Sequence, residues 1–576
     1  MTVQPDRSSI EHLKCKYKQF PEKFMLGTAS SAYQIEGAWN NDGKTESIWD
    51  RVAHTKQELF ADDLESDDTN FPNVNMISEN KFSCVSKGRP MYRVKYKQHR
   101  AAPITGDIAC NSYYKVDEDV KLLKELKVQS YRFSLSWPRI LPRGEDSYIN
   151  PAGVQYYNRL IDKLIENNIT PIVTIYHWDL PQCIQDLGGW CNKQIIEFFT
   201  LYVRVVFRTF GDRVKYWITI NEPYLVSESY GNEAGAPALN KSGYGDYLAI
   251  HHTILAHATA YHIYNREFRP LQNGQIGISL NMEWYYPKNV SSLEDHYAAH
   301  RARMWQFGVF AHPLFFGDYP EDVKQGVMET NQFCGISLKR LHDFSENEKY
   351  LIKVPFRKSK NDLSKVPAQE HIFRKDATFD TFEQYFILNS GTLDFLGINH
   401  YFSVHATKLQ STQHQSLKTR DSNFELSLIE EIPYSNPTWI KETPKGMRNL
   451  LCWIRDTYGN PKIIITENGV SDKGQNEDED ALIKRRYHYG YLSAVLNAIY
   501  EDGCNVIGYE VWSFLDSLEW FFGYREKFGM YRVDFNDQNR SRYPKKSLQF
   551  FKQLFQTRTL PDVLNDLYCE NNCDRG

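Results

Sequence analysis

Two glutamates stand where paired carboxyl groups could act together. Each directly follows a short apolar run, in the sequences Asn221-Glu222-Pro223 and Glu467-Asn468-Gly469. Cleavage of a glycosidic bond needs such a pair, because one carboxyl group protonates the leaving oxygen while an ionised one attacks the anomeric carbon. Arg132, inside an earlier apolar run, would favour the ionised form of Glu467 if the fold brings them together. A single glutamate after a strand is usually a helix cap or a salt-bridge partner, but two that each adjoin an asparagine favour the catalytic interpretation.

Polar and aromatic residues that suit a sugar follow the other apolar runs. Sugar hydroxyl groups need donors and acceptors in pairs, and the C–H face of a pyranose ring packs well on an aromatic side chain. The residues with these properties are Gln34, His177, Asn399, Tyr401, Trp512, Glu519 and Trp520. A buried tryptophan such as Trp512 is normally a core residue, so the sequence leaves both interpretations open for it.

Three histidines, His251, His252 and His257, have the spacing of metal ligands on a helix. No carboxylate or cysteine is placed to complete a coordination shell. We therefore expect these histidines to be ordinary core or surface residues, and we expect no metal site.

The elements that must position these residues are short apolar runs alternating with amphipathic segments. Runs of this length suit strands buried on both faces, as in a parallel sheet. Periods near 3.6 follow them, around residues 116–126, 160–165, 447–454 and 487–499. The eight runs are Phe24–Thr28, Ser130–Ser134, Pro171–Tyr176, Lys215–Ile220, Gln275–Leu280, Leu393–Ile398, Lys462–Thr466 and Val506–Trp512.

Eight such units predict an α/β protein, a single (β/α)8 TIM barrel whose active site lies at the carboxyl ends of the strands. The alternative is an open, doubly wound sheet, which the absence of a GxGxxG sequence after the first run disfavours.

The length of 576 residues suggests roughly four domains at about 150 residues each, but barrels with insertions exceed that size. Two polar, aperiodic segments, 57–103 and 354–381, read as loop insertions. The predicted organisation is an N-terminal tail (1–19), a barrel (20–556) and a C-terminal tail (557–576). The basic part of the first insertion contains Tyr92 and Tyr96 but resembles a solvated loop more than a nucleic-acid-binding patch.

Composition narrows the range of partners. With 68 basic and 72 acidic residues the net charge is -4, which gives no support for nucleic-acid binding. No stretch approaches 18 apolar residues, and residues 1–18 lack the apolar core of a signal peptide. The sequence thus predicts a chain without membrane association, cytoplasmic or, if a leader precedes it, secreted. It leaves open the oligomeric state and disulfides at Cys183/Cys191 and Cys569/Cys573.

Four motifs together resemble those of glycoside hydrolase family 1, the β-glucosidase family, over about residues 20–555. Ile220 stands where that family commonly has Phe, and Ser517-Leu518 where Asn-Phe is usual. The overall pattern is similar to insect members. The motifs are Tyr33-Gln34-Ile35-Glu36-Gly37-Ala38, Thr219-Ile220-Asn221-Glu222-Pro223, Ile465-Thr466-Glu467-Asn468-Gly469 and Trp512-Ser513-Phe514-Leu515-Asp516-Ser517-Leu518-Glu519-Trp520.

The resemblance implies a role for each matching residue. Glu222 would be the acid/base and Glu467 the nucleophile. Arg132 and Tyr401 would contact the nucleophile, and Asn399 would support the site. The remaining residues would bind the sugar: Gln34, His177, Asn221 and Glu519 its hydroxyl groups, Trp512 and Trp520 its ring, and Phe528 the pocket wall. No cofactor is implied.

The expected function is therefore a retaining β-glycosidase that acts on small β-glycosides or oligosaccharides. β-Glucosides are the first candidates, with β-galactosides and β-fucosides next. A thioglucosidase is an alternative, since some insect thioglucosidases keep the acid/base Glu that plant myrosinases replace with Gln. A transglycosidase would share all these residues. A non-catalytic glycan-binding relative is disfavoured because Glu222 and Glu467 are both present.

Overall fold

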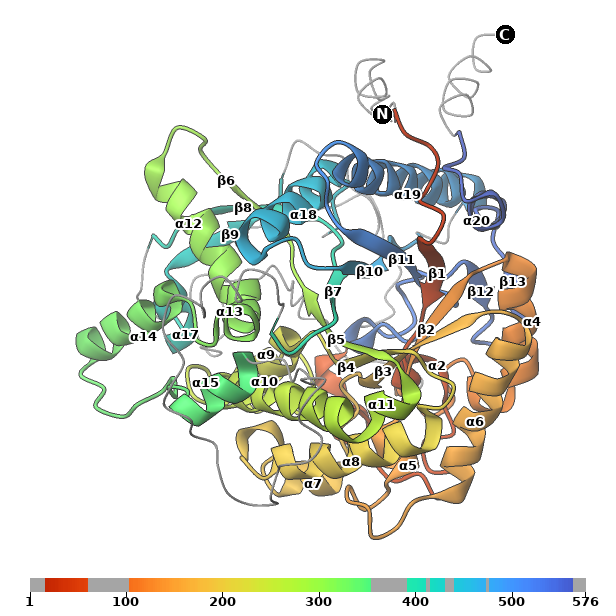
Figure 1. Ribbon diagram of the computed structural model, residues 1–576, viewed down its shortest axis with the longest axis horizontal. Coiled ribbons are helices and arrows are strands. Elements are labelled where there is room, and N and C mark those ends of the chain that lie inside the picture. Colours follow the sequence, from red (N-terminus) through yellow and green to blue (C-terminus); the bar gives the residue numbers. More distant parts are fainter. Residues whose placement is uncertain are drawn as a thin grey trace, which may run out of the picture.

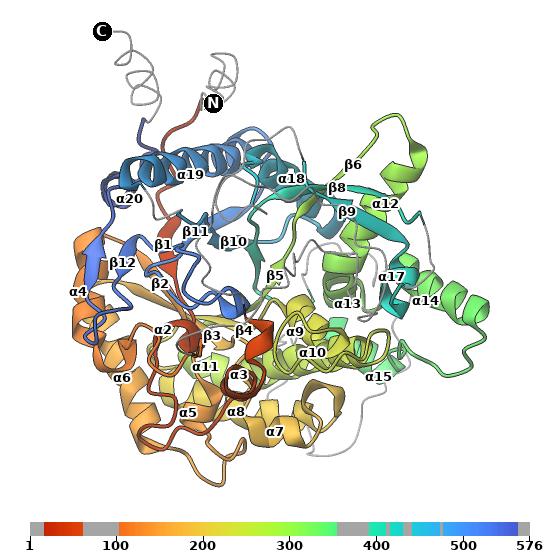
Figure 2. The ribbon, with the colours of Figure 1, turned by 180° about the vertical axis from the view of Figure 1, so that it is seen from behind.

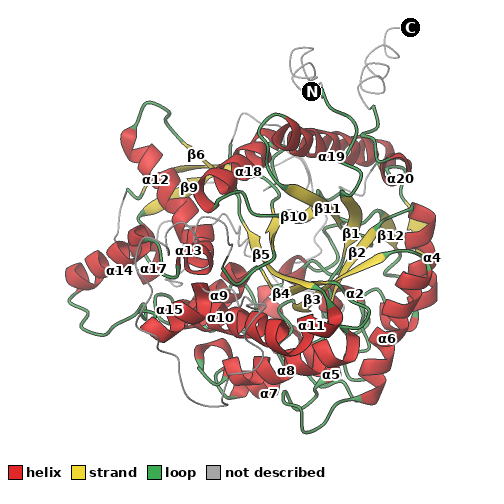
Figure 3. Cartoon of the chain, viewed as in Figure 1, coloured by secondary structure: helices red, strands yellow, loops and turns green. Residues whose placement is uncertain are grey.

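A computed structural model describes residues 16–60, 103–353, 391–410, 415–429, 440–472 and 476–562. Eight parallel strands form a closed barrel in the order β1-β11-β10-β7-β5-β4-β3-β2, and helices surround this ring (Figures 1 and 3). The strands are β1 Met25–Ala29, β2 Ser130–Ser134, β3 Thr170–Tyr176, β4 Tyr216–Asn221, β5 Gln275–Asn281, β7 Phe395–Asn399, β10 Ile463–Asn468 and β11 Val506–Trp512. The predicted (β/α)8 barrel is confirmed, and the open-sheet alternative is wrong because β1 pairs with both β2 and β11.

The helices between the strands account for the amphipathic periods in the sequence. The four predicted segments fall in α4, α6, α18 and α19, and each buries most of its periodic apolar residues, although Ile165 is exposed and Ile499 is half-buried. The helices are α2 Ala32–Ile35, α3 Ile48–Thr55, α4 Val116–Leu126, α5 Trp137–Ile140, α6 Pro151–Glu166, α7 Gln182–Asp186, α8 Ile195–Phe210, α9 Pro223–Gly231, α10 Gly245–Ile263, α11 Arg269–Gln272, α12 Leu293–Arg303, α13 Val309–Phe316, α14 Glu321–Cys334, α15 Glu346–Lys353, α17 Leu417–Ser422, α18 Pro444–Tyr458, α19 Glu477–Tyr500 and α20 Leu548–Thr557.

The strands of the barrel are mostly apolar because both of their faces are covered. Towards the barrel axis, Ile172, Ile218, Phe395 and Ile464 from four strands form a fully buried layer. Towards the outside, the strands pack against the helices in the main core. This double burial is why the strands read as continuous apolar runs rather than as an alternating pattern.

Two small sheets lie outside the barrel. One is β6 (Trp284–Pro287), β8 (Ser403–Lys408) and β9 (Phe424–Ser427); the other is β12 (Tyr531–Val533) with β13 (Arg542–Pro544). Strands of three to six residues are too short for a periodic signal, and the sequence analysis did not predict them. The two described ends of the chain meet, since Lys18 pairs with Asp562 at 2.9 Å, as the red and blue ends of the ribbon in Figure 2 indicate.

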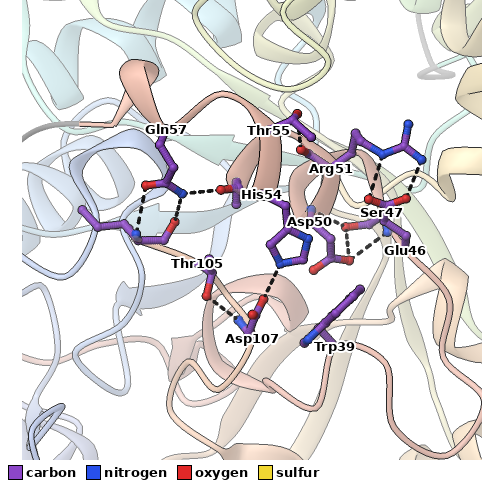
Figure 4. Close-up of polar contacts among 12 residues, drawn as sticks. Trp39, Glu46, Ser47, Asp50, Arg51, His54, Thr55, Gln57, Thr105 and Asp107 are labelled. Atoms are coloured by element: carbon purple, nitrogen blue, oxygen red, sulfur yellow. Dashed lines mark hydrogen bonds and ion pairs between the residues drawn. The ribbon is translucent and has the colours of Figure 1, made fainter. Parts of the chain in front are cut away.

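The beginning of the predicted insertion 57–103 belongs to the packed structure. Gln57 begins a short 3-10 helix, and its amide binds both backbone groups of Ile104, at 2.9 and 3.0 Å (Figure 4). Phe60 is buried against Phe521. Figure 4 also shows His54 paired with Asp107 at 2.9 Å, which further ties the two sides of this segment together. The rest of the segment, 61–102, and the predicted insertion 354–381 lie outside the described residues.

The structure shows the state of one of the two cysteine pairs and the character of the described helices. Cys183 and Cys191 are free thiols and not a disulfide, whereas Cys569 and Cys573 lie outside the described residues. Within the described ranges, no helix combines the length and the apolar character needed to cross a membrane.

A buried carboxyl group, Glu510 on β11, lies inside the barrel. The Ser130 hydroxyl donates a hydrogen bond to it, and Gly27 makes room for it, since a Cβ there would collide with the Glu510 carboxyl. Burial raises the pKa of Glu510 to about 8, although Ser130 and the charge of Arg132 oppose the shift. The group is therefore protonated in the folded protein at neutral pH.

We expect Glu510→Gln to stabilise the protein at alkaline pH. Because the pKa is raised on folding, the unfolded state loses this proton near pH 4.5 and the native state only near pH 8. Wild-type stability should thus fall across this window by about 1.4 kcal/mol per pH unit from this group, and the neutral amide removes that loss. Denaturant melts from pH 5 to 8 test this, with exposed Glu22→Gln as control. A gap between variant and wild type that stays constant with pH would contradict it.

Candidate active site

The carboxyl ends of the strands bring the two predicted catalytic glutamates to one mouth of the barrel. Glu222 directly follows β4 and is the N-cap residue before α9, and Glu467 lies near the end of β10. Both are buried, at 5% and 4% exposure. Glu222 has a positive φ of 45°, a conformation that non-glycine residues rarely adopt and that is concentrated at functional sites.

Glu467 is held by two donors, one on each oxygen. Arg132, which is completely buried on β2, donates from Nη1 to Oε1 at 2.5 Å. The Tyr401 hydroxyl donates to Oε2 at 2.8 Å. Glu467 therefore accepts one hydrogen bond from a buried guanidinium and one from a phenol, and the expected contact with Arg132 is present.

Glu222 is held by a neutral amide instead. Asn399, which ends β7, donates from Nδ2 to Glu222 Oε1 at 2.7 Å. Its own oxygen accepts hydrogen bonds from Thr466 at 2.6 Å and Ser279 at 3.1 Å. These two hydroxyl groups fix the orientation of the amide, so that its N–H group faces Glu222. Ser279 and Thr466 thus support the site, a role that no motif assigned to them.

Asn221 joins the two halves of the site. Its Oδ1 accepts from Arg132 Nη2 at 2.6 Å and from Asn399 Nδ2 at 3.1 Å. Its Nδ2 lies 3.2 Å from His177 Nε2. Burial and the charge of Arg132 lower the pKa of His177 well below its ordinary value, so the imidazole is neutral. The structure thus brings Arg132, Asn221, His177 and Asn399 together around the glutamates, as predicted.

A second polar group lies beside this cluster. Gln34 donates from Nε2 to the backbone oxygen of Leu518 at 2.8 Å and to Glu519 Oε2 at 3.3 Å. Ser31 donates to Gln34 Oε1 at 2.6 Å and fixes the amide. Burial, together with the negative charges of Glu526 and Glu467, raises the pKa of Glu519 to about 8. Glu519 is therefore mainly a neutral acid at pH 7, one that can both donate and accept a hydrogen bond.

The aromatic residues form a stack at the same place. The ring of Trp520 lies 4.5 Å from Trp178 and 6.0 Å from Tyr33, which is nearly parallel to it. His177 lies parallel to both Trp512 and Trp520. Trp512 is 4% exposed, so it is a core residue by burial and a site residue by contact.

Two further aromatic residues complete the wall. Phe528 is buried and meets the Tyr401 ring edge-on at 6.2 Å. Trp178 packs against Trp520 with its ring tilted by 38°, and its indole N–H donates to the backbone oxygen of Asn221 at 2.9 Å. The sequence analysis did not single out Trp178 as a site residue, although its place next to His177 could have indicated it.

The three helical histidines are core residues, as predicted. His257 contacts Thr219 at 2.7 Å and the Thr392 carbonyl at 2.9 Å through its two ring nitrogens. His252 contacts the Trp190 carbonyl, and His251 stacks on Phe344. Among the described residues, no group of three or more His, Cys, Asp or Glu side chains is arranged to hold a metal ion.

A (β/α)8 barrel with paired glutamates at the strand ends defines a glycoside hydrolase. The chain belongs to glycosyl hydrolase family 1, whose family model matches residues 16–77 and 91–560. It is similar to Myrosinase 1 of Brevicoryne brassicae, with 40% identity over 540 residues that cover 94% of this chain and 99% of that protein. It is also similar to Beta-glucosidase 6 of Oryza sativa subsp. japonica, with 36% identity covering 93% and 91%.

Solved structures agree with this assignment. An aphid myrosinase has a TM-score of 0.76 at 39% identity and covers 94% of this chain and 99% of that chain. A rice β-glucosidase has a TM-score of 0.74 at 33% identity and covers 93% and 99%. The protein is therefore a β-glycosidase of this family, with a glycoside as its substrate.

Proposed function

We propose that this protein hydrolyses β-glucosides with retention of configuration, through a double displacement by Glu467 and Glu222. The observation that carries the proposal is the difference between the two carboxyl environments. Glu467 faces the cation of Arg132 and the Tyr401 hydroxyl, while Glu222 faces the neutral amide of Asn399. Two carboxyl groups in different surroundings can take different roles. Glu467, which contacts a cation, is the nucleophile, and Glu222 is the acid/base.

In the first step a Glu467 oxygen forms a bond to the anomeric carbon, and the bond from that carbon to the leaving oxygen breaks. Glu222 gives its proton to that oxygen. In the second step the resulting carboxylate takes a proton from water, whose oxygen bonds to the anomeric carbon while the bond from that carbon to Glu467 breaks. This mechanism requires the two carboxyl groups to lie about 5–5.5 Å apart. A related rice β-glucosidase, 33% identical, has been solved in a covalent complex with Glc, which supports a glycosyl-enzyme intermediate here.

The direct test follows hydrolysis of nitrophenyl β-glucoside by NMR. We expect β-glucose to appear first and to equilibrate with the α-anomer later. If α-glucose appears first, the enzyme inverts and the nucleophile assignment is wrong. A parallel assay with the β-galactoside measures how far the site tolerates an inverted O4. Comparison of the β-fucoside with the β-galactoside then measures the effect of a missing O6.

Thioglucoside cleavage is the second candidate. It is supported by the 40% identity with Myrosinase 1, whereas other relatives include Beta-glucosidase 6, at 36% identity, and a Lactase-like protein of Mus musculus, at 36% identity. A side-by-side assay of a glucosinolate and nitrophenyl β-glucoside separates the two activities. Adding an alcohol acceptor to the same assay measures transglycosylation, since the glycosyl-enzyme can react with either water or the alcohol.

We further expect a preference for unphosphorylated sugars, because of Glu519. The group lies within 3.3 Å of Gln34 and near the charges of Glu467 and Glu526, where a sugar 6-phosphate would add about -1.5 to -2 charges. Cellobiose should therefore be hydrolysed faster than its 6′-phosphate. Glu519→Ser should weaken plain glucosides by about two- to tenfold per lost hydrogen bond, since hydrogen bonds of neutral groups contribute ~0.5–1.5 kcal/mol. Faster hydrolysis of the phosphate by the wild type would refute the assignment of Glu519.

A further inference from the structure

The buried face of α19 carries three polar side chains that the catalytic mechanism does not use. Lys484, Tyr487 and Tyr491 are separated by three and four residues, so they lie on one side of the helix. The helix packs beside β10 and β11 on the outside of the barrel (Figure 1). All three side chains reach backbone carbonyl groups of the candidate site.

Lys484 is 1% exposed, and its ammonium group meets four oxygen atoms, three of them at 3.0 Å and the fourth, the Lys527 carbonyl, at 3.4 Å. Nζ donates to the carbonyls of Phe528 and Gly529, each at 3.0 Å, and pairs with Asp472 Oδ1 at 3.0 Å. An ammonium group has three N–H donors, and these three acceptors can use all of them. The backbone that carries the Phe528 ring is thus fixed to α19.

Tyr487 and Tyr491 hold the backbone of Tyr401, whose ring packs against Phe528. Their hydroxyl groups donate to the Tyr401 carbonyl at 2.6 and 2.8 Å. The Tyr401 side chain in turn donates to Glu467 and meets the Phe528 ring edge-on. The buried face of α19 therefore fixes the backbone of both residues of this aromatic contact, Tyr401 and Phe528.

The segment that carries Glu519 is fixed on its other side by a second lysine. Lys545 binds Asp516 at 2.6 Å and also pairs with Asp472, the partner of Lys484. Asp516 accepts a hydrogen bond from the backbone N–H of Gly529 at 2.9 Å. Asp472 thus links the buried Lys484 and the partly buried Lys545, which hold residues 516 and 528–529, on either side of Glu519.

We propose that Lys484 is a positioning residue for the sugar-binding end of the site. It holds Phe528 against Tyr401, and so keeps the pocket wall and the Tyr401 hydroxyl in place for the sugar and for Glu467. This proposal rests on the proposed function, in which Tyr401 and Phe528 contact the sugar. The reason for a lysine at this buried place is the convergence of two carbonyl groups and a carboxylate, which a neutral side chain cannot satisfy together.

The test compares wild type with Lys484→Met. We expect KM for nitrophenyl β-glucoside to rise about tenfold, equivalent to ~1.4 kcal/mol, with a much smaller change in kcat. The same factor should apply to a second aglycone, because the wall contacts the sugar. The dissociation constant of glucose, measured by titration calorimetry, should rise in parallel and needs no turnover.

A second variant separates positioning from folding. Lys484→Met alone leaves Asp472 with less compensation and lowers the melting temperature, so we add Asp472→Asn, which removes the partner charge. The double variant should regain thermal stability but keep the weakened glucose affinity. The matched control is Lys546→Met, since Lys546 is exposed and pairs with Asp478 at the start of the same helix; its KM should not change.

Two outcomes would overturn the proposal. One is an unchanged glucose affinity in Lys484→Met, and the other is recovery of affinity together with stability in the double variant, which would make Lys484 a folding residue only. Wild-type activity decides the proposed function separately. If the wild type prefers another β-glycoside, the same comparison of variants is made with that glycoside and its free sugar.

Discussion

Glu467→Gln is expected to lower kcat by about 10⁴-fold or more, since removal of a catalytic nucleophile has effects of this size in other hydrolases. The amide has the same size but cannot form the glycosyl ester that the mechanism needs. Arg132 and Tyr401 would then face a neutral group in place of the carboxylate they contact. The measurement is kcat for nitrophenyl β-glucoside, with a thermal melt and glucose binding to show that the variant is folded.

Rescue by a small anion makes this prediction specific to nucleophile loss. In Glu467→Gly the space of the carboxyl group is open, so azide can attack the anomeric carbon directly while the nitrophenolate leaves. We expect restored turnover and an α-glucosyl azide product, because a single displacement inverts the configuration. A β-glucosyl azide from this variant would show that another residue forms the covalent intermediate.

Glu222→Gln is expected to slow substrates in proportion to how poorly their aglycone leaves. General acid catalysis contributes about 10²–10⁴-fold, so cellobiose and alkyl glucosides should lose rate by about this factor. Dinitrophenyl glucoside needs no protonation and should show little loss in the glycosylation step. The alkaline limb of the kcat/KM profile should also disappear, because it reports ionisation of the acid.

Azide rescue of a Glu222 variant is the control for the assignment of the acid/base, and its product has the opposite anomeric configuration to that of Glu467→Gly. With Glu222→Ala, azide is expected to attack the glycosyl-enzyme in the second step and to give β-glucosyl azide, with configuration retained. A substitution of Asn399 serves as a further comparison. Asn399 contacts Glu222 and Asn221, but its amide is not an acid that can protonate the leaving group. An equal loss for all leaving groups in Glu222→Gln would assign the acid to another residue.

The sequence by itself determined the barrel, the family resemblance and the two glutamates. The runs at 130–134 and 506–512 coincide with β2 and β11, and the other six agree with their strands within one or two residues at each end. This success has a physical reason, because a strand buried on both faces is mostly apolar, and such a run ends where the chain leaves the core. Glu222 and Glu467 were predicted as the catalytic pair because catalytic groups of a barrel follow directly after these ends.

Only the tertiary structure decided how the site residues are supported and charged. The hydroxyls of Ser279 and Thr466 orient Asn399, and α19 holds Tyr401 and Phe528, through contacts between segments distant in sequence. No local sequence pattern predicts such contacts, because they depend on which strand ends lie next to one another in the barrel. The raised pKa of Glu519 is likewise a consequence of burial and of neighbouring charges from other segments. Residue type and spacing identify the groups that can react, whereas the fold sets their protonation and their alignment.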